Sequence, residues 1–409
     1  MKKNRIFTNI IDQGPVTLKA AQTRGDWGTT QEILSKGSQW IQDQVAQSDL
    51  RERSHGGEYV AKKWEKREAA YIVINACSNE PGSGTEKYLL RYEPHKVIEG
   101  ALLIGAALGA HTCYICIRGE YLQEREILES ALEEVREKNL LGQFQIYIHE
   151  GAGGTLCGEE TALLESLEGR KAMPRVNGDR KLYGCSAVIH GVETVATIPE
   201  ILRRGAPWFA SLGTLHSKGT KLFSLSGHVE TPCVVEEEMG VSLKELIETH
   251  GGGVKGGWGF FLAVIPGGSS TGFLPKEICN DLCLDFESLE RVSSCLGTGG
   301  IVVMDKSTDI VRVTARLAQF YQQESCGKCT PCRVGTGWVF QLLERLSVGQ
   351  GEKEDLDQLQ DLLQRMSETS LCAFGGWAAA PVVSLLRYFQ PELEHRIHMY
   401  NVASKRVKV

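Results

Sequence analysis

Three cysteines separated by two residues each, Cys326, Cys329 and Cys332, stand in the segment ESCGKCTPCR. Three thiolates with this spacing can converge on one centre, and a fourth from a distant segment completes the shell of a [4Fe-4S] cluster. The best fourth candidate is Cys372 in SLCAFGG, because it lies in the same region and its glycines let the backbone approach a cluster. Zinc is the main alternative, but structural zinc sites typically use two separate CxxC pairs. The 3+1 spacing therefore predicts iron and sulfur.

A second candidate site is a glycine-rich turn that leads into an acidic helix. Residues 150–169 read EGAGGTLCGEETALLESLEG, with Glu159 and Glu160 in the first turn of the expected helix. The glycines let backbone amides face an anion or a ring system, and a helix N-terminus adds partial positive charge. The pattern is neither GxGxxG nor a P-loop, so spacing alone leaves two interpretations: a phosphate-bearing cofactor site or an ordinary acidic cap.

Composition describes a soluble, folded chain and excludes some partners. The 409 residues are enough for two to four domains. The net charge of -6 shows no basic excess that would favour nucleic acid or an anionic membrane. No apolar stretch follows the basic N-terminus, and the apolar run 97–110 contains Glu99 and is too short to cross a bilayer. We expect a cytoplasmic protein with no direct membrane span, attached to a membrane only through other subunits.

Thirteen cysteines without a secretory signal indicate reduced thiols rather than a disulfide framework. Cys113 and Cys116 form a CxxC, but their segment is rich in β-formers, where positions three apart point to opposite faces of a strand. We therefore expect both to pack in the core. Five further cysteines without ligand-like neighbours are expected to be buried apolar thiols: Cys185, Cys233, Cys279, Cys283 and Cys295.

The elements that position these residues change along the chain. The first half alternates buried strands at 69–77 and 110–119 with helices at 97–110 and 125–142, which indicates a mostly parallel α/β sheet. A hairpin is expected at 221–236, and a glycine-rich turn into a strand at 249–270, as in a small α+β module. Beyond the strand-like GGIVVMD the apolar spacing becomes helical, which predicts a C-terminal bundle.

Several segments together are typical of one protein family: CGEETALLESLEG, GTKLFSLSGHV, PGGSS, GTGGIVVMD, ESCGKCTPCR and LCAFG with FQPELEHRI. They resemble the NADH-binding flavoprotein subunit of respiratory complex I, which is the F subunit of the bacterial NADH-quinone oxidoreductase and is also called the 51 kDa subunit. Related subunits serve NAD-linked hydrogenases and formate dehydrogenases. The resemblance covers nearly the whole chain. It implies a Rossmann-like flavin domain over 1–218, a ubiquitin-like SLBB-type module over 219–304, and a helical bundle with one [4Fe-4S] cluster over 305–409.

The resemblance also implies an activity and a set of site residues. In such a subunit NADH passes a hydride to FMN, and the cluster takes the electrons one at a time toward quinone. Its expected partners are other peripheral-arm subunits, including a [2Fe-2S] thioredoxin-like subunit and the large iron-sulfur subunit. Glu80 and Glu160 match catalytic positions near the nicotinamide. The cofactor-binding positions are Arg53, Gly56, Gly57, Lys63, Asn75, Gly158, Glu159 and Thr194, and the cluster ligands are Cys326, Cys329, Cys332 and Cys372.

Departures from the family gather at the flavin and nucleotide positions. Where the family loop reads Gly-Arg-Gly-Gly-Ala-Gly-Phe-Pro-Thr-Gly, this chain places other residues at four of the glycines and Glu58 at the phenylalanine. A side chain at such a glycine blocks the approach of backbone to ligand, and a carboxylate repels phosphate. Tyr59 is the one hypothetical replacement for the lost stacking ring. The four residues at the glycine positions are Glu52, Ser54, His55 and Ala61. Cys77, Ser78, Thr155, His190 and Gly191 also differ from the family, and VNGDRK replaces a proline-rich segment.

Three hypotheses follow. The first is an NADH dehydrogenase subunit that binds FMN in a modified pocket and passes electrons to the cluster. The second is a flavin-less paralogue that keeps the fold and cluster as an electron relay or structural subunit. The third is a soluble NAD reductase that serves a hydrogenase or formate dehydrogenase, and it differs from the first only in its partners. The intact CGEET segment favours the first, and the loop substitutions favour the second.

Overall fold

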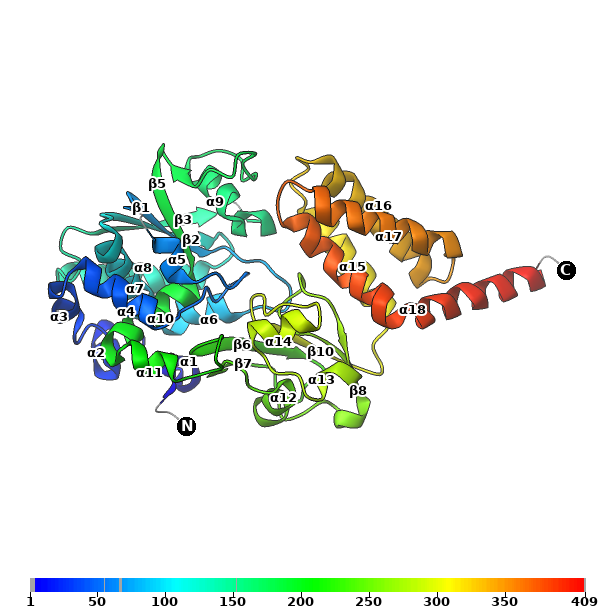
Figure 1. Cartoon of the computed structure of the whole chain (residues 1–409), viewed down its shortest axis with the longest axis horizontal. Helices are drawn as coiled ribbons and strands as arrows, with labels where there is room; N and C mark the ends of the chain where they lie inside the picture. Colours follow the sequence, from blue (N-terminus) through cyan, green and yellow to red (C-terminus); the bar gives the residue numbers. More distant parts are fainter. Residues whose placement is uncertain (1–3, 55, 66–67, 152, 408–409) are drawn as a thin grey trace.

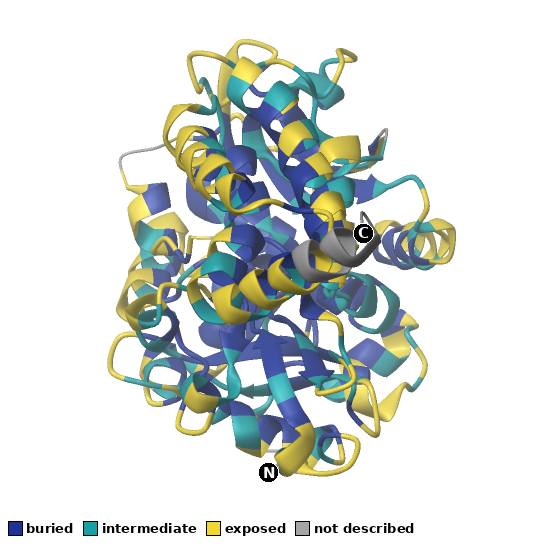
Figure 2. Cartoon of the chain, turned by 90° about the vertical axis from the view of Figure 1, so that its right-hand side faces the viewer, coloured by how far each residue is buried: buried dark blue, intermediate teal, exposed yellow. Residues whose placement is uncertain are grey.

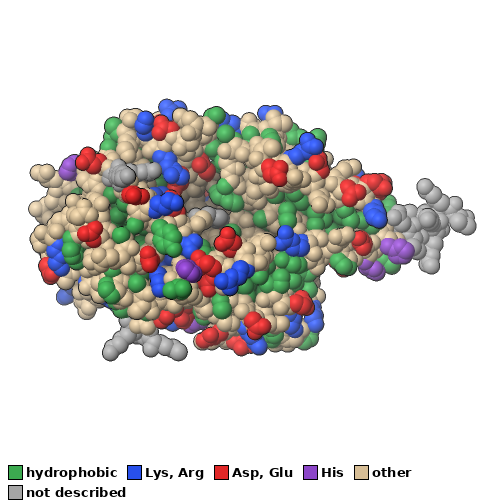
Figure 3. Space-filling view, in the orientation of Figure 1, with side chains coloured by type: hydrophobic (Ala, Val, Ile, Leu, Met, Phe, Trp, Pro, Cys, Tyr) green, Lys and Arg blue, Asp and Glu red, His purple; other side chains and the backbone are tan. Residues whose placement is uncertain are grey.

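The structure is a computed structural model that describes residues 4–54, 56–65, 68–151 and 153–407. Its elements form an N-terminal unit (α1 to α11), a middle unit (β6 to β10) and a C-terminal bundle (α15 to α18) (Figure 1). His55, one of the substituted loop positions, lies outside the described residues. On the face drawn in Figure 3, acidic and basic side chains are mixed.

The N-terminal unit is built on a sheet with the strand order β3-β2-β1-β5-β4. The pairs β3-β2, β2-β1 and β1-β5 are parallel, and β4 is antiparallel to β5. The strands are β1 (Tyr71–Ala76), β2 (Thr112–Arg118), β3 (Gln145–Gly151), β4 (Lys181–Leu182) and β5 (Cys185–Gly191). In register, Asn75 lies between Cys116 of β2 and Gly191 of β5. The carboxyl ends of these strands therefore meet at one edge, where ligands bind in sheets of this kind.

Helices surround this sheet, as the alternating sequence pattern predicts (Figure 1). They are α1 (Thr8–Asp12), α2 (Leu18–Arg24), α3 (Thr30–Ser35), α4 (Ser38–Gln47), α5 (Val60–Trp64), α6 (Thr85–Tyr92), α7 (Pro94–Leu108), α8 (Leu122–Glu137), η2 (Thr155–Gly158), α9 (Glu160–Leu167), α10 (Val192–Arg204) and α11 (Ala206–Ala210). The apolar α7 is buried on nearly all sides. Its one acid, Glu99, is tolerated because Arg203 forms an ion pair with it at 2.8 Å.

The middle unit has a mixed sheet with the order β7-β6-β10-β8-β9. The predicted hairpin is the antiparallel pair β6-β7, and β10 lies parallel to β6 and antiparallel to β8. The elements are β6 (Thr220–Gly227), β7 (Cys233–Glu238), α12 (Leu243–His250), η3 (Trp258–Phe260), β8 (Phe261–Ile265), β9 (Leu274–Pro275), α13 (Lys276–Cys279), α14 (Phe286–Arg291) and β10 (Gly300–Asp305). The glycine-rich turn does lead into a strand, β8, as expected.

Four helices form the C-terminal bundle: α15 (Ile310–Glu324), α16 (Thr330–Ser347), α17 (Lys353–Thr369) and α18 (Phe374–Val407). Their apolar faces share one core (Figure 2). The backbone of α18 leaves helical geometry at Phe389, two residues before Pro391, because proline clashes with the preceding turn. Beyond this kink α18 extends away from the bundle (Figure 1). No helix in the described ranges is both long and apolar enough to span a membrane.

The cysteines outside the cluster motif only partly follow the prediction. Cys113 and Cys116 are buried in the core of the first sheet, as expected. Of the five isolated cysteines, Cys279 is fully buried, whereas Cys185 and Cys295 are exposed. The expectation was wrong for these two because both lie outside regular core positions, Cys185 at the start of β5 and Cys295 in the loop before β10. Cys233 and Cys283 are half-buried.

Candidate functional site

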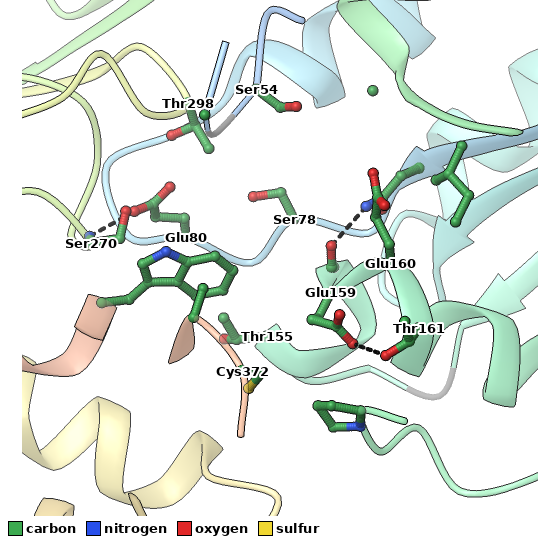
Figure 4. A pocket seen from close by; sticks show the side chains of 18 of the residues that line it. Ser54, Ser78, Glu80, Thr155, Glu159, Glu160, Thr161, Ser270, Thr298 and Cys372 are labelled. Atoms are coloured by element: carbon green, nitrogen blue, oxygen red, sulfur yellow. Dashed lines mark hydrogen bonds between the residues drawn. The ribbon is translucent and has the colours of Figure 1, made fainter. Parts of the chain in front are cut away.

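A cavity of about 660 Å³ lies where the three units meet. The N-terminal unit contributes most of its wall, the middle unit contributes Ser269, Ser270, Cys295 and Thr298, and the bundle contributes Tyr321, Cys372 and Trp377. Figure 4 shows Glu80 and Ser270 on one side, Glu159 and Glu160 on the opposite side, and Cys372 between them at the base. The volume is that of a typical pocket for a cofactor or small ligand.

Most residues predicted for the site line this cavity. They are Gly56, Lys63, Asn75, Glu80, Gly158, Glu159, Glu160 and Cys372. Three predicted cofactor contacts lie behind the wall instead. Thr194 is buried and its hydroxyl accepts from the Arg53 backbone, while the Arg53 side chain donates to the Lys218 carbonyl. A Cβ on Gly57 would stand 2.4 Å from the Phe286 ring, so this glycine serves packing against the middle unit.

The strand edge and the glycine-rich turn are joined by Asn75. Its side-chain amide donates to the Gly158 carbonyl at 2.8 Å, and its oxygen accepts from the Cys77 backbone at 3.1 Å. The end of β1 is thereby tied to η2, directly before α9. Gly158 has 3.8 Å of clearance from Cys77 to the position of a Cβ, so the cavity wall here is formed by backbone.

The two acidic residues at the start of α9 make different contacts. Glu159 is the N-cap, and its carboxylate accepts from the Ala162 backbone at 2.8 Å and from the Thr161 hydroxyl at 2.7 Å (Figure 4). Glu160 faces the other way and pairs with Lys63 at 2.9 Å and with Arg180 at 2.6 Å. The acidic-cap interpretation is therefore right for Glu159, and the N-terminus of its helix forms part of the cavity wall.

Lys63 is the centre of a buried charge network at one corner of the cavity. Its ammonium lies 3.2 Å from Glu52, 2.9 Å from Glu160 and 2.6 Å from the Ile189 carbonyl. Glu52 is 3% exposed and also accepts from the Thr194 hydroxyl at 2.8 Å and from His190. Burial alone would raise the pKa of the Glu52 carboxyl, but Lys63 and these hydrogen bonds outweigh it and hold the pKa well below its usual range.

The directions of the hydrogen bonds at His190 follow from its neighbours. The Trp64 indole N–H, which can only donate, lies 2.8 Å from His190 Nε2. Nε2 must therefore accept, and the proton sits on Nδ1, which donates to Glu52. His190 therefore gives Glu52 one ring N–H, and Lys63 adds an ammonium to the same carboxylate.

Glu80 joins the N-terminal unit to the middle unit. Its carboxylate accepts from the Ser270 backbone at 2.6 Å (Figure 4). A Cβ at Gly268 would lie 2.4 Å from the Glu80 carboxyl carbon, and Gly268 has φ +98°, so only glycine fits this approach. The segment 266–270 quoted for the resemblance, PGGSS, is thus the middle unit's contribution to the cavity.

The other loop substitutions lie away from the cavity centre. Glu58 is exposed, and its backbone carbonyl accepts from the Glu52 N–H at 2.8 Å. Tyr59 lies against the Arg51 guanidinium, 5.3 Å from ring centroid to Cζ, instead of entering the cavity as a replacement ring would. Ser54 does line the cavity, next to Gly191. Of the two new carboxylates, Glu58 is exposed, whereas Glu52 is buried directly behind Lys63 and His190, which line the cavity.

The four cysteines predicted to hold a cluster gather at the base of the bundle. Cys329 is the N-cap of α16, Cys332 lies in its first turn, and Cys372 lies between α17 and α18. Burial raises the pKa of the Cys332 and Cys372 thiols to about 11, and neighbouring cysteines, Cys326 among them, act in the same direction on both. The positive charge of bound iron would offset this cost, as ligand thiols must be deprotonated.

Backbone and charge around the cysteines complete this site. The Phe374 backbone forms a hydrogen bond with Cys372, of the kind that stabilises a liganding thiolate. Lys328, between two cysteines, donates to the Pro174 carbonyl at 2.7 Å and so ties the motif to the N-terminal unit. Among the described residues, no group of three His, Cys, Asp or Glu side chains is arranged to hold a single metal ion.

Sequence reasoning missed several residues that line the cavity. These are Glu86, Arg175, Arg180, Ser269, Cys295, Thr298, Tyr321 and Trp377. Ser269 lies in the PGGSS segment, which the motif pattern does single out. Arg180 belongs to the VNGDRK segment, which does reach the cavity although it differs from the family pattern.

Family comparisons agree with the three units. Residues 45–200 match the Nuo51 FMN-binding domain, residues 221–313 match the SLBB domain, and residues 312–396 match the NADH-ubiquinone oxidoreductase-F iron-sulfur binding region. The predicted fold class is thereby confirmed: a Rossmann-like flavin domain, an SLBB module and a helical iron-sulfur region. The cavity's volume and its mixed polar and apolar wall fit a flavin, and the corner next to Glu52 departs from the family pattern.

Relatives match the chain along almost its whole length. The F subunit of NADH-quinone oxidoreductase from Rickettsia bellii is 48% identical over 97% of this chain and 99% of the relative, and that from Rickettsia massiliae is 47% identical over 98% and 99%. An NAD⁺-reducing [NiFe]-hydrogenase in the H₂-reduced state has a chain of the same fold, with TM-score 0.84 and 30% identity over 97% of this chain and 71% of that one. The chain therefore belongs to the family of the NADH-quinone oxidoreductase F subunit.

Proposed function

We propose that this chain is the NADH dehydrogenase subunit of a complex I, taking electrons from NADH at the central cavity and passing them to a [4Fe-4S] cluster held by Cys326, Cys329, Cys332 and Cys372. The observation that carries the proposal is that Cys372 lines the same cavity as the flavin-domain residues. Glu159 lies close enough for its charge to raise the pKa of the Cys372 thiol. Electrons accepted in the cavity would thus have the cluster at its wall.

The residues of the chain have distinct roles in this proposal. Asn75, Gly56, Gly158 and Glu159 shape the wall against which FMN binds, and Lys63 holds the corner behind it. FMN, when bound, supplies the exchange between two-electron and one-electron transfer. Glu80 and Glu160 lie on opposite sides of the cavity and would orient the nicotinamide (Figure 4).

The domain boundaries, partners and location are part of the same proposal. We infer domains of 1–218, 219–304 and 305–409: the first boundary falls between α11 and β6, and the second lies at the last residue of β10, just before the segment that leads to α15. We infer that the partners are peripheral-arm subunits, among them a [2Fe-2S] thioredoxin-like subunit and the large iron-sulfur subunit, with quinone reached through them. The complex would hold the chain on the cytoplasmic face of the membrane.

The test combines cofactor content with two cysteine variants. Purified protein should contain flavin and about four irons, and should reduce ferricyanide with NADH. Cys372→Ser should abolish or convert the iron-sulfur EPR signal, whereas Cys295→Ser, at another cavity cysteine, should leave it unchanged. Protein that stays flavin-free after reconstitution with FMN would refute the dehydrogenase role, and an unchanged EPR signal in Cys372→Ser would place the fourth ligand elsewhere.

A further inference from the structure

The corner of the cavity around Glu52 has the composition of an anion-binding site. An ammonium, an imidazole N–H and a hydroxyl converge on one buried carboxylate, from Lys63, His190 and Thr194. Lys63 and His190 also line the cavity, so the same donors face a ligand placed there. Glu52 thus lies directly behind this part of the cavity wall and accepts from groups of the kind that bind anions.

The donors of this corner are already engaged. The three protons of the Lys63 ammonium are directed to Glu52, Glu160 and the Ile189 carbonyl. The single N–H of His190 and the hydroxyl of Thr194 are both given to Glu52. An incoming anion could bind these groups only by displacing the Glu52 carboxylate.

The start of helix α10 lies in the same corner. Gly191 is its N-cap, has no side chain to satisfy the helix terminus, and lines the cavity. Glu52 Oε2 is 4.0 Å from the position of a Cβ on Gly191, and Ser54 Oγ is 3.4 Å from it. The Glu52 carboxylate therefore lies beside the N-terminus of α10, the end of a helix that favours negative charge.

The local charges are already balanced. Lys63 and Arg180 are positive, and Glu52 and Glu160 are negative. Behind the wall, the next cations, Arg53 and Lys221, both face Glu193. A phosphate monoester would add a charge of about -1.5 to -2 next to the Glu52 carboxylate, which Lys63, His190 and Thr194 hold in place.

We infer that Glu52 is a specificity-determining residue, because its carboxylate takes the donors that would otherwise bind an anion at this corner of the cavity. The chain then recognises the ring and sugar-alcohol part of a flavin and gains little from a terminal phosphate. The inference rests on the proposed function insofar as the ligand is a flavin. The chain should therefore bind a flavin without phosphate, such as riboflavin, at least as tightly as it binds FMN. The presence of Glu52 removes the advantage that a phosphate would bring.

The experiment compares FMN and riboflavin on the full-length protein that retains its cluster, by quenching of flavin fluorescence. The parent should bind the two ligands with affinities within about threefold of each other. Glu52→Ala should tighten FMN binding by about tenfold or more, because a like charge is removed, and leave riboflavin nearly unchanged. Glu52→Gln, which keeps the shape and one accepting oxygen but removes the charge, should give a smaller gain. Glu58→Ala, at an exposed carboxylate of the same loop, is the matched control and should change neither affinity.

A second readout does not depend on flavin. Inorganic phosphate should raise the melting temperature of Glu52→Ala, and of Glu52→Gln to a lesser extent, but not that of the parent. The inference is overturned if the parent prefers FMN over riboflavin by about a hundredfold, or if both variants keep the parent's preference and its indifference to phosphate. If neither the parent nor the variants bind a flavin while phosphate stabilises the two Glu52 variants, the proposed function is refuted. The inference that Glu52 takes the place of an anion would still hold.

Discussion

The Lys63 network makes a quantitative prediction about stability. Lys63→Met keeps most of the apolar stem but removes the full positive charge facing Glu52, whose side chain is 4% exposed. Removing one partner of a buried ion pair costs about 3–5 kcal/mol, because the remaining charge is stranded. Glu52 keeps hydrogen bonds from His190 and Thr194 after the change, so we expect a loss near the lower end of that range.

A double-mutant cycle tests whether the stranded carboxylate is the cause. If it is, adding Glu52→Gln to Lys63→Met should recover about 2–3 kcal/mol, because the uncompensated charge disappears. The assay is urea denaturation followed by circular dichroism, with the free energy of unfolding compared among the parent, both single variants and the double variant at pH 8. Additive effects, or a loss below about 1 kcal/mol in Lys63→Met, would refute the buried-pair reasoning.

The pH dependence supplies a second check of the same cycle. In the parent, the folded-state pKa of Glu52 is depressed, so its contribution is complete above the unfolded value of 4.5 and is lost as the pH falls below it. In Lys63→Met, burial is no longer offset and the pKa of Glu52 should rise above the unfolded value. The deficit of the variant should then be largest at pH 8 and shrink as the pH falls toward 5.

Two further predictions concern the cavity wall. Gly268→Ala should destabilise the protein by about 1–3 kcal/mol, because φ is +98° and the Cβ would stand 2.4 Å from the Glu80 carboxyl carbon; Gly259→Ala, at an open position, is the thermal-melting control, and equal effects would contradict the close approach. Burial raises the pKa of Glu86 from 4.5 to about 7, so its ionisation destabilises the fold as the pH rises from 4.5 through 7. Glu86→Gln should therefore gain about 1–3 kcal/mol in urea denaturation at pH 8 and nothing at pH 4.5, and a gain independent of pH would show that charge is not the cause.

The features that could be predicted from the sequence are those that depend on short segments of the chain. The spacing of Cys326, Cys329 and Cys332 is a property of ten residues, and the strand containing Asn75 shows its buried, apolar pattern directly. Parallel strands bring their carboxyl ends to one edge, so the meeting of Asn75 with the turn before Glu159 follows from the order of the elements. The family match of the cysteine region confirmed the iron-sulfur interpretation.

The unpredictable part depended on contacts between distant segments. The sequence identified Glu52 as a substituted position but could not show where its side chain points. Two of its hydrogen-bond partners, His190 and Thr194, are 138 and 142 residues away along the chain. Cys295 and Trp377 carry no motif and reach the cavity only because the middle unit and the bundle dock there. The expected burial of Cys295 failed for the same reason: its environment is set by the junction and not by its own segment.

The position of the cavity at the junction of three units has a consequence for assembly. Its wall is closed by the Glu80–Ser270 bond, by Lys328 on the Pro174 carbonyl, and by the Thr155 N–H, which donates to Glu324 at 2.6 Å. Each unit contributes only part of the pocket, so a ligand in the cavity binds best when all three are docked. Binding of the cluster would order the loop that carries Cys372, and this order would strengthen binding of the ligand in the cavity. Because thermodynamic coupling is reciprocal, the bound ligand would strengthen binding of the cluster by the same factor. Maturation of the two redox centres should consequently be cooperative, with either one serving as the template on which the other is completed.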